Sequence, residues 1–254
     1  MFSTVDGEPL AIVVGGESNG EILFWKDPNL KTTSVLKEFP HKETTLHSGH
    51  FEMIPNPKVR IIFVAASSGA GKTSFCAKYA EKYLKLHPSV EFHLFSQVEE
   101  DESIDYLKPH RIMMDQSIVE NPIELDEIEE HTLLMFDDFD TITDKAVQKA
   151  VDSLISKVLK LGRHKDIKVL ITSHQINPNN KTLGRDILNE MQCLVCFPSS
   201  GSKYYLDYCL KRDFGMSAKQ KTKIHSLDSR WVCLLKNYPQ VVLSEKYCTF
   251  VKDL

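Results

Sequence analysis

The chain has 254 residues, of which 42% are hydrophobic and 26% are charged, and its formal net charge is −4. This composition is ordinary for a soluble protein and provides enough apolar residues for one sizeable domain. No apolar run approaches the ~18 residues of a membrane span, and the N-terminus lacks the pattern of a signal peptide. Six cysteines in a chain of this length indicate a reducing compartment and argue against a disulfide scaffold.

Residues 1–57 differ from the rest and are predicted to form a small β appendage. Two strand-like segments, residues 10–14 and 21–25, are separated by glycines and an asparagine that supply turn chemistry. We therefore expect a β-hairpin there, followed by a polar connector with several prolines. The main domain is predicted to span residues 58–254.

That domain opens on a buried strand, a glycine-bearing loop and a helix. Gly69 and Gly71 let the backbone turn tightly, so that successive N–H groups face phosphate oxygens. The pattern is that of a P-loop, G-x-x-x-x-G-K-[ST], except that Ala66 stands in place of the first glycine. Alanine tolerates positive φ poorly, so the geometry at Ala66 stays open. The predicted nucleotide-binding residues are Ser67, Ser68, Gly69, Ala70, Gly71, Lys72, Thr73 and Ser74.

Two residues of this loop have defined chemical roles. Lys72 is expected to reach the β- and γ-phosphates of ATP, and the Thr73 hydroxyl is expected to ligate Mg²⁺. The following helix, residues 74–86, presents its positive N-terminal end to the same phosphates. The alternative interpretation is a glycine turn before an ordinary helix.

Beyond the loop, short apolar runs alternate with helical patterns. This alternation predicts an α/β fold with a mainly parallel sheet and right-handed crossovers. The chain is predicted to close on a β-hairpin, residues 231–235 and 240–243. Cys193 and Cys196 form one C-x-x-C, which a buried strand explains better than zinc, since no second pair lies nearby. The other strands are predicted at 90–95, 111–114, 132–138, 167–172 and 192–197, and helices at 143–161, 183–191, 204–214 and 218–226.

Asp137 and Asp138 end the apolar strand 132–138. A P-loop NTPase needs a carboxylate beside the Mg²⁺ ion, and Asp137 is predicted to fill that role. Asp138 is predicted to polarise the attacking water. The alternative is a strand that ends in an Asp-rich turn.

Polar residues also end the strand 167–172. We expect one of them to sense the γ-phosphate, with Gln175 favoured and Ser173 and His174 close behind. The alternative is a residue that merely caps the following turn. Arg163, at the end of the preceding helix, is predicted to enter a neighbouring subunit's site and neutralise transition-state charge. Alternatively, Arg163 only satisfies the last carbonyl groups of its helix. Arg185 is the other candidate for the arginine that enters a neighbouring site.

Charge is distributed unevenly along the chain. Residues 97–140 contain fifteen Asp or Glu against Lys108 and Arg111. The segment 203–223 is basic, which suggests a face for an anionic partner, although two solvated faces are an equal alternative. The candidate DNA-binding residues are Lys203, Lys211, Arg212, Lys219, Lys221 and Lys223. Tyr204, Tyr205 and Tyr208 are expected to serve helix packing and not base stacking.

Taken together, residues 66–73, 133–138 and the run from Gly162-Arg163-His164 into 167–174 resemble the FtsK/HerA-like genome-packaging ATPases of large DNA viruses, giant viruses and virophages. The resemblance covers residues 58–200 well and the remainder loosely; the hairpin at Arg230-Trp231-Val232 is also similar to that group, and residues 1–57 have no counterpart in it. It implies a RecA-like core with an additional strand between the P-loop strand and the Asp137 strand. It also implies a homo-oligomeric ring that hydrolyses ATP with Mg²⁺ and translocates double-stranded DNA into a capsid.

On this interpretation the protein is a DNA-stimulated ATPase in the host cytoplasm, at a viral factory, or in the virion. Capsid or vertex proteins are possible partners, and no membrane span is expected. Two alternatives are a small-molecule P-loop kinase and a nucleotide-switch scaffold. Few arginines follow Gln175, which argues against the arginine-rich lid of a small-molecule kinase. The predicted catalytic residues are all present, which argues against an inactive site in a switch protein: Lys72, Thr73, Asp137 and Asp138.

Overall fold

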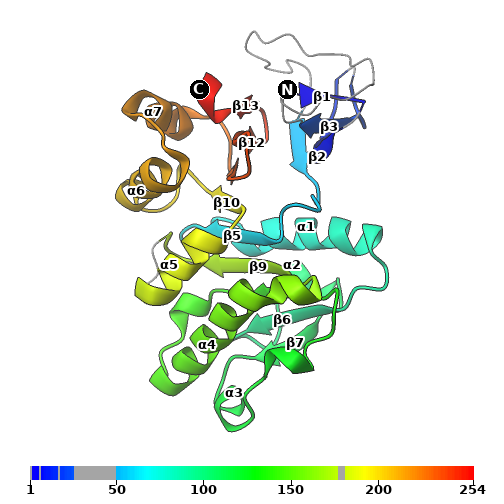
Figure 1. Cartoon of the computed structure of the whole chain (residues 1–254), viewed down its shortest axis with the longest axis vertical. Coiled ribbons are helices and arrows are strands. Elements are labelled where there is room, and N and C mark those ends of the chain that lie inside the picture. Colours follow the sequence, from blue (N-terminus) through cyan, green and yellow to red (C-terminus); the bar gives the residue numbers. More distant parts are fainter. Residues whose placement is uncertain (1, 6, 17, 26–49, 177–180) are drawn as a thin grey trace.

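Two β-sheets organise the part of the chain that the structure describes, which is residues 2–5, 7–16, 18–25, 50–176 and 181–254 (Figure 1). The structure is a computed structural model. The predicted connector, residues 26–49, lies outside the described residues.

The larger sheet has nine strands in the order β13-β12-β11-β10-β5-β9-β8-β6-β7. Neighbouring strands from β10 to β7 run parallel, and β11, β12 and β13 are antiparallel, so the predicted mainly parallel sheet is confirmed. β9 lies between β5 and β8, which is the additional strand that the resemblance implied. The strands are β5 Ile61–Ala65, β6 Phe92–Ser96, β7 His110–Met113, β8 Leu133–Phe136, β9 Lys168–Ser173, β10 Cys193–Cys196, β11 Val232–Leu235, β12 Val241–Ser244 and β13 Cys248–Phe250.

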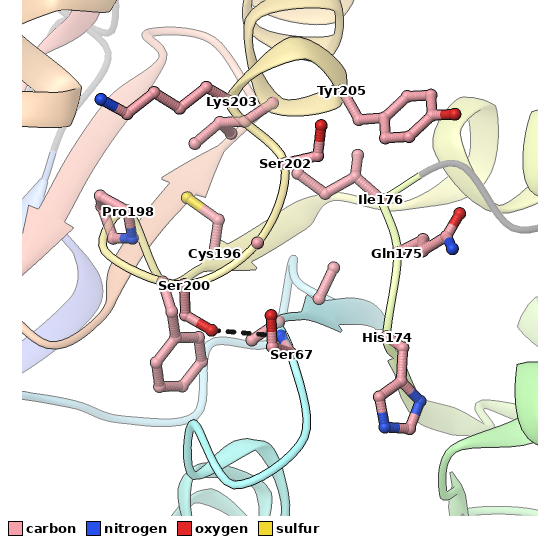
Figure 2. A pocket seen from close by; sticks show the side chains of 15 residues that line it. Ser67, His174, Gln175, Ile176, Cys196, Pro198, Ser200, Ser202, Lys203 and Tyr205 are labelled. Atoms are coloured by element: carbon pink, nitrogen blue, oxygen red, sulfur yellow. Dashed lines mark hydrogen bonds between the residues drawn. The ribbon is translucent and has the colours of Figure 1, made fainter.

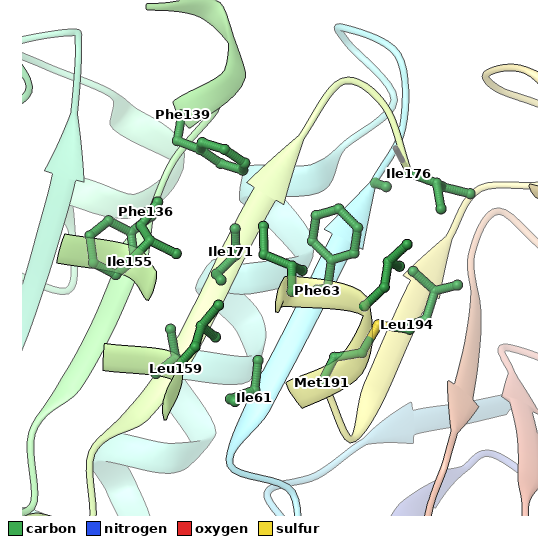
Figure 3. Packing of buried hydrophobic residues seen from close by; sticks show 14 of the residues in the cluster. Ile61, Phe63, Phe136, Phe139, Ile155, Leu159, Ile171, Ile176, Met191 and Leu194 are labelled. Atoms are coloured by element: carbon green, nitrogen blue, oxygen red, sulfur yellow. The ribbon is translucent and has the colours of Figure 1, made fainter. Parts of the chain in front are cut away.

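Helices cover both faces of this sheet. Side chains alternate along β5, so Ile61 and Phe63 pack toward α4 and α5 (Figure 3), while Ile62 and Val64 pack toward α1. Each face carries its own apolar core, which holds the strand ends of the sheet in place. The helices are α1 Lys72–Leu86, α2 Glu102–Asp105, α3 Ser117–Glu120, α4 Lys145–Leu161, α5 Lys181–Glu190, α6 Lys203–Phe214 and α7 Ala218–Ser226.

The N-terminal residues form a second, antiparallel sheet in the order β1-β3-β2-β4. The predicted hairpin corresponds to β2 and β3, and it is confirmed. Two further strands join it, and β4 links it to the main domain because the Phe51 N–H donates to the Glu245 carbonyl at 2.7 Å. Phe2 also stacks on Phe250 with ring centroids 4.2 Å apart. The strands are β1 Phe2–Ser3, β2 Glu8–Val14, β3 Ile22–Trp25 and β4 His50–Met53.

The C-terminal hairpin is confirmed as β11 and β12, and β13 extends it by one strand. All six cysteines are free and buried, and Cys193 and Cys196 belong to the buried strand β10, as predicted. Among the described residues, none of the helices combines the length and the apolar character that a bilayer crossing requires.

One expectation about side-chain packing is wrong. Tyr204 and Tyr208 are 75% and 52% exposed, whereas Tyr205 is half-buried against the core. The spacing i, i+4 places the first two on the outer face of α6, because Leu206 and Leu210 take the inner face.

Candidate functional site

The loop between β5 and α1 accommodates alanine at its first position. The Ala66 N–H donates to the Ser173 carbonyl at 3.1 Å, which continues the pairing of β5 with β9. The left-handed turns fall on Gly69, with φ of 73°, and Gly71, with φ of 105°, and not on Ala66. Ala66 therefore stays in strand-like pairing, and the glycine-specific geometry begins three residues later.

Helix α1 begins at this loop, and the described residues give it no side-chain cap. Gly71 is its N-cap, and within the described residues no side chain caps it and no acidic residue lies in its first turn. α4, in contrast, is capped by the Asp144 side chain, which accepts from two backbone N–H groups. The free N–H groups of α1 and its positive dipole end suit a phosphate group.

Lys72 and Asp138 meet below the loop. The Lys72 Nζ atom lies 3.2 Å from Asp138 Oδ1 and donates to the Ala66 carbonyl at 3.2 Å. The Lys72 side chain is only 4% exposed, so its ammonium group is held where a phosphate on the loop would meet it. The structure thus brings together the loop and the carboxylate strand that sequence reasoning assigned to one site.

Thr73 and Asp137 lie close enough to share a metal ion. Thr73 Oγ1 donates to Asp137 Oδ1 at 3.4 Å, near the spacing of about 3 Å between adjacent oxygens around Mg²⁺. Thr172 Oγ1 donates to the same Asp137 oxygen at 2.8 Å and holds the carboxylate in place. Hard oxygen donors at this spacing fit Mg²⁺, so these residues would hold the ion beside the phosphates.

Burial raises the pKa of Asp137 to about 6, against an opposing hydrogen bond from Thr172. Since the folded-state pKa exceeds the unfolded value of 3.8, the stability that this carboxyl contributes falls as pH rises between those values. Without Mg²⁺, we expect Asp137→Asn to raise the free energy of unfolding at about pH 7.5 by roughly 1–3 kcal/mol, and the gain to vanish near pH 4. Urea unfolding across this pH range measures it.

The control for this prediction is Asp115→Asn. Asp115 is an exposed carboxylate whose pKa is lowered by hydrogen bonds from Ser117, so the exchange should bring no gain at neutral pH. An Asp137→Asn variant that is less stable than the natural chain at both ends of the pH range would contradict the prediction.

His174, and not Gln175, points at the carboxylates. His174 Nε2 lies 3.6 Å from Asp138 Oδ2, and its Nδ1 lies 3.4 Å from Asp140 Oδ1. Gln175 is exposed, and in Figure 2 its side chain points to a different side from the His174 ring. The γ-phosphate role of Gln175 stays a prediction, and the geometry favours His174 among the three candidates.

A pocket of about 430 Å³ opens beside the loop at the C-terminal ends of β5, β9 and β10 (Figure 2). The Ser67 N–H donates to Ser200 Oγ at 3.2 Å across one end of it, and His174 and Gln175 border the other. Ser67, which lines this pocket, is exposed, as are Ser68 and Gly69 of the same loop. This edge of the sheet is where open α/β sheets bind ligands.

Sequence reasoning missed two supporting residues. Thr172 Oγ1 accepts the Asp138 N–H at 2.6 Å, and its one proton lies between Asp137 Oδ1 at 2.8 Å and Asp138 Oδ1 at 3.1 Å, so the hydroxyl spaces the pair. Asp140 accepts from Ser173 Oγ at 2.8 Å and from the His174 N–H at 2.9 Å, which ties the end of β8 to the end of β9. The available signals were a polar residue inside an apolar strand and a third aspartate in the turn.

The two candidate arginines lie away from this edge. Arg163 is exposed in the turn Gly162–Lys165, which follows α4 and precedes β9. Because β9 runs parallel to β5, this turn lies at the opposite edge of the sheet from the P-loop. Arg185 is exposed on α5. Neither arginine contacts the site of its own chain in the described residues.

The candidate DNA-binding residues share one region, helices α6 and α7. Arg212 pairs with Asp213 at 2.9 Å, and Lys221 pairs with Asp207 at 3.4 Å. The remaining four are exposed and form no ion pair within the described part of the chain: Lys203, Lys211, Lys219 and Lys223. α6 and α7 lie at the opposite end of the molecule from α3 and the acidic segment around it (Figure 1).

The P-loop, the paired aspartates at the end of β8 and the additional strand between them define the fold and site of a P-loop ATPase. By sequence, the chain is 32% identical over 249 residues to Uncharacterized protein V3 of Sputnik virophage, with 94% of each chain covered. It belongs to the same family as that virophage protein. No protein-family model matches the chain.

Solved structures share the fold at low identity. B204, the DNA-packaging ATPase from Sulfolobus Turreted Icosahedral Virus, matches with a TM-score of 0.50 at 13% identity, over 74% of this chain and 98% of that one. The genome packaging NTPase B204 from Sulfolobus turreted icosahedral virus 2, in complex with ATP-gammaS, matches with a TM-score of 0.49 at 13% identity, over 76% and 100%. The match to B204 from Sulfolobus Turreted Icosahedral Virus shows that the chain shares the fold of that ATPase.

Proposed function

We propose that this protein is an ATP-hydrolysing motor that translocates double-stranded DNA into a viral capsid. The observation that carries the hydrolytic part is the meeting of Lys72, Thr73, Asp137 and Asp138 at one edge of the sheet. The shared fold with B204 and the kinship to a virophage protein support the packaging role. Residues 1–57 are proposed to form an appendage to an ATPase domain of residues 58–254.

In the proposed reaction, the loop N–H groups and Lys72 bind the phosphates, and Thr73 and Asp137 hold Mg²⁺. The metal ion neutralises charge on the phosphates when it is bound. Asp138 accepts the proton of the attacking water, and His174 and Thr172 hold its carboxylate toward the loop. Gln175 is retained as an alternative γ-phosphate sensor.

DNA is proposed to contact the exposed basic residues of α6 and α7 through its phosphates. Such contacts suit a motor, because a motor must bind every sequence alike. Arg212 lies over the ring of exposed Tyr208, at 5.9 Å from its centroid, so a planar cation and an aromatic ring flank the lysines. The finer proposals of a homo-oligomeric ring, of capsid or vertex partners, and of a location in the host cytoplasm or virion accompany this function.

The test is the ATPase rate of the full chain against protein concentration, with and without duplex DNA. We expect a steep rise with concentration, stimulation by DNA, and loss of that stimulation as salt is raised. Replacing the four unpaired lysines of α6 and α7 by alanine should abolish the stimulation. Equal rates with and without DNA would argue against a motor, and tight nucleotide binding without turnover would favour a switch.

A control with lysines elsewhere separates this effect from a general loss of charge. Lys157 and Lys160 on α4 are each paired with a carboxylate, so their replacement should leave DNA stimulation intact.

The same assay tests whether Arg163 acts in trans. If it does, adding Arg163→Ala subunits to the natural protein should lower the ATPase rate by a larger fraction than the fraction of variant subunits in the mixture. Arg185→Ala subunits test the rival.

A further inference from the structure

Arg230 crosses from the segment before β11 to the outer side of the phosphate loop. Its Nε–H donates to the Ala70 carbonyl at 3.0 Å, a contact between residues 160 positions apart. Its guanidinium also covers Gly71, because a Cβ at that position would stand 2.7 Å from a terminal guanidinium nitrogen. The φ of 105° at Gly71 favours glycine, and an alanine there would also require the flexible guanidinium of Arg230 to shift.

Glu245 holds Arg230 in this position. The Arg230 backbone N–H donates to Glu245 Oε2 at 2.9 Å. Ser229 strengthens the link, since its hydroxyl accepts the Glu245 N–H at 3.1 Å and donates to the Trp231 carbonyl at 2.7 Å. Glu245 also accepts the Phe51 N–H of β4, so the N-terminal sheet braces the same turn.

The neighbour of Arg230 contacts the helix that follows the loop. The Trp231 ring packs edge-on against Phe75 of α1, with centroids 5.3 Å apart and planes at 64°. The segment that leads into the C-terminal hairpin therefore contacts the P-loop region on both sides of Lys72. Arg230 contacts Ala70 and Gly71, which precede Lys72, and Trp231 contacts Phe75, which follows it. This arrangement does not enter the proposed reaction.

We infer that Arg230 is a positioning residue that orients the Ala70–Gly71 peptide for phosphate binding. In a trans peptide the carbonyl and the N–H point in opposite directions. When the charged Arg230 side chain draws the Ala70 carbonyl outward, the Gly71 N–H is directed into the loop, where it meets a phosphate. The inference rests on the proposed nucleotide site and assigns part of its formation to the C-terminal hairpin.

The loop N–H groups next to Lys72 cradle the β-phosphate, which ATP and ADP share. We therefore expect Arg230→Ala to weaken the binding of ATP and ADP equally, with the Kd of each raised about tenfold. Turnover at saturating ATP should change less than about threefold, because the hydrolytic groups are untouched. Arg230→Lys should restore part of the affinity, since an ammonium group can still donate to the Ala70 carbonyl.

Fluorescence titration of ADP and of a non-hydrolysable ATP analogue measures these affinities. The matched control is Lys246→Ala. Lys246 lies next to Glu245 and pairs with Asp228, so the exchange removes a nearby cation without changing a contact to the phosphate loop. Unchanged affinity in Arg230→Ala would overturn the inference while leaving the proposed function standing. A loss confined to the ATP analogue would also overturn it, because Arg230 would then act on the γ-phosphate. A natural chain that bound no ADP would overturn the proposed function and this role with it.

A double-mutant cycle without nucleotide tests the contact itself. Gly71→Ala should lower the unfolding temperature more in the natural chain than in the Arg230→Ala chain, because only the former holds a guanidinium against the new methyl group. Equal decreases in both chains would show that the guanidinium gives way to the methyl group at no cost, so its contact with the loop would be too weak for the positioning role.

Discussion

Asp138→Asn is expected to lower the rate of ATP hydrolysis about 100- to 1,000-fold while ATP binding is retained. An asparagine amide preserves the shape of the side chain but cannot accept the proton of the attacking water. Binding should hold or improve, because a negative charge 3.2 Å from Lys72 Nζ is removed and the ammonium group becomes free for phosphate. Single-turnover hydrolysis, measured beside nucleotide titration, separates the two effects.

This prediction distinguishes Asp138 from its neighbour. Asp137→Asn should instead weaken the dependence on Mg²⁺, because Asp137 lies beside Thr73 and Asp138 lies beside Lys72. Turnover of Asp138→Asn within about threefold of the natural chain would show that another group activates the water. His174, which lies 3.6 Å from the Asp138 carboxylate, would then be the next candidate.

Lys72→Ala is expected to impair both nucleotide binding and turnover, unlike Asp138→Asn, with kcat/KM reduced about 1,000-fold or more. The ammonium group is enclosed, lies 3.2 Å from Asp138, and its charge also acts on the Asp137 carboxylate. Without it, an incoming triphosphate meets uncompensated negative charge. Both nucleotide affinity and turnover should therefore fall, in contrast to Asp138→Asn.

The control for Lys72→Ala is Lys82→Ala on the same helix. Lys82 pairs with Glu52 of β4 at 2.6 Å and lies away from the loop, so its loss should leave nucleotide affinity unchanged. Nucleotide titration and phosphate release under identical conditions compare the two variants. Retained ATP affinity in Lys72→Ala would show that the loop N–H groups bind phosphate without the lysine.

Local chemistry made much of the site predictable. The glycines, Lys72 and Thr73 form one continuous run, and the carboxylates follow directly on an apolar strand, so each motif marks both an element boundary and a function. The order of elements then implied a parallel sheet, whose strand ends meet at one edge. The predicted helix 218–226 matches α7, Ala218–Ser226, whose first turn in the structure is fixed by a Ser217–Gln220 capping box.

Other assignments depended on side-chain direction. Polar residues 173–175 span the end of β9. The backbone turn after the strand places His174, and not Gln175, beside Asp138. Tyr204 and Tyr208 were expected to pack inward, yet they face outward, because leucines on α6 fill the inner face. Short strands such as β1 and β13 carry too few residues for a periodic signal.

The sequence by itself determined that a phosphate-binding loop precedes a helix and that paired aspartates end a buried strand. These features are local, and their chemistry is legible from adjacent residues. Only the tertiary structure decided which distant groups complete the loop. Arg230 reaches Ala70 across 160 positions because antiparallel pairing brings β11 beside β10, and β10 lies beside β5. No local pattern encodes that approach, since it depends on the order of strands in the sheet.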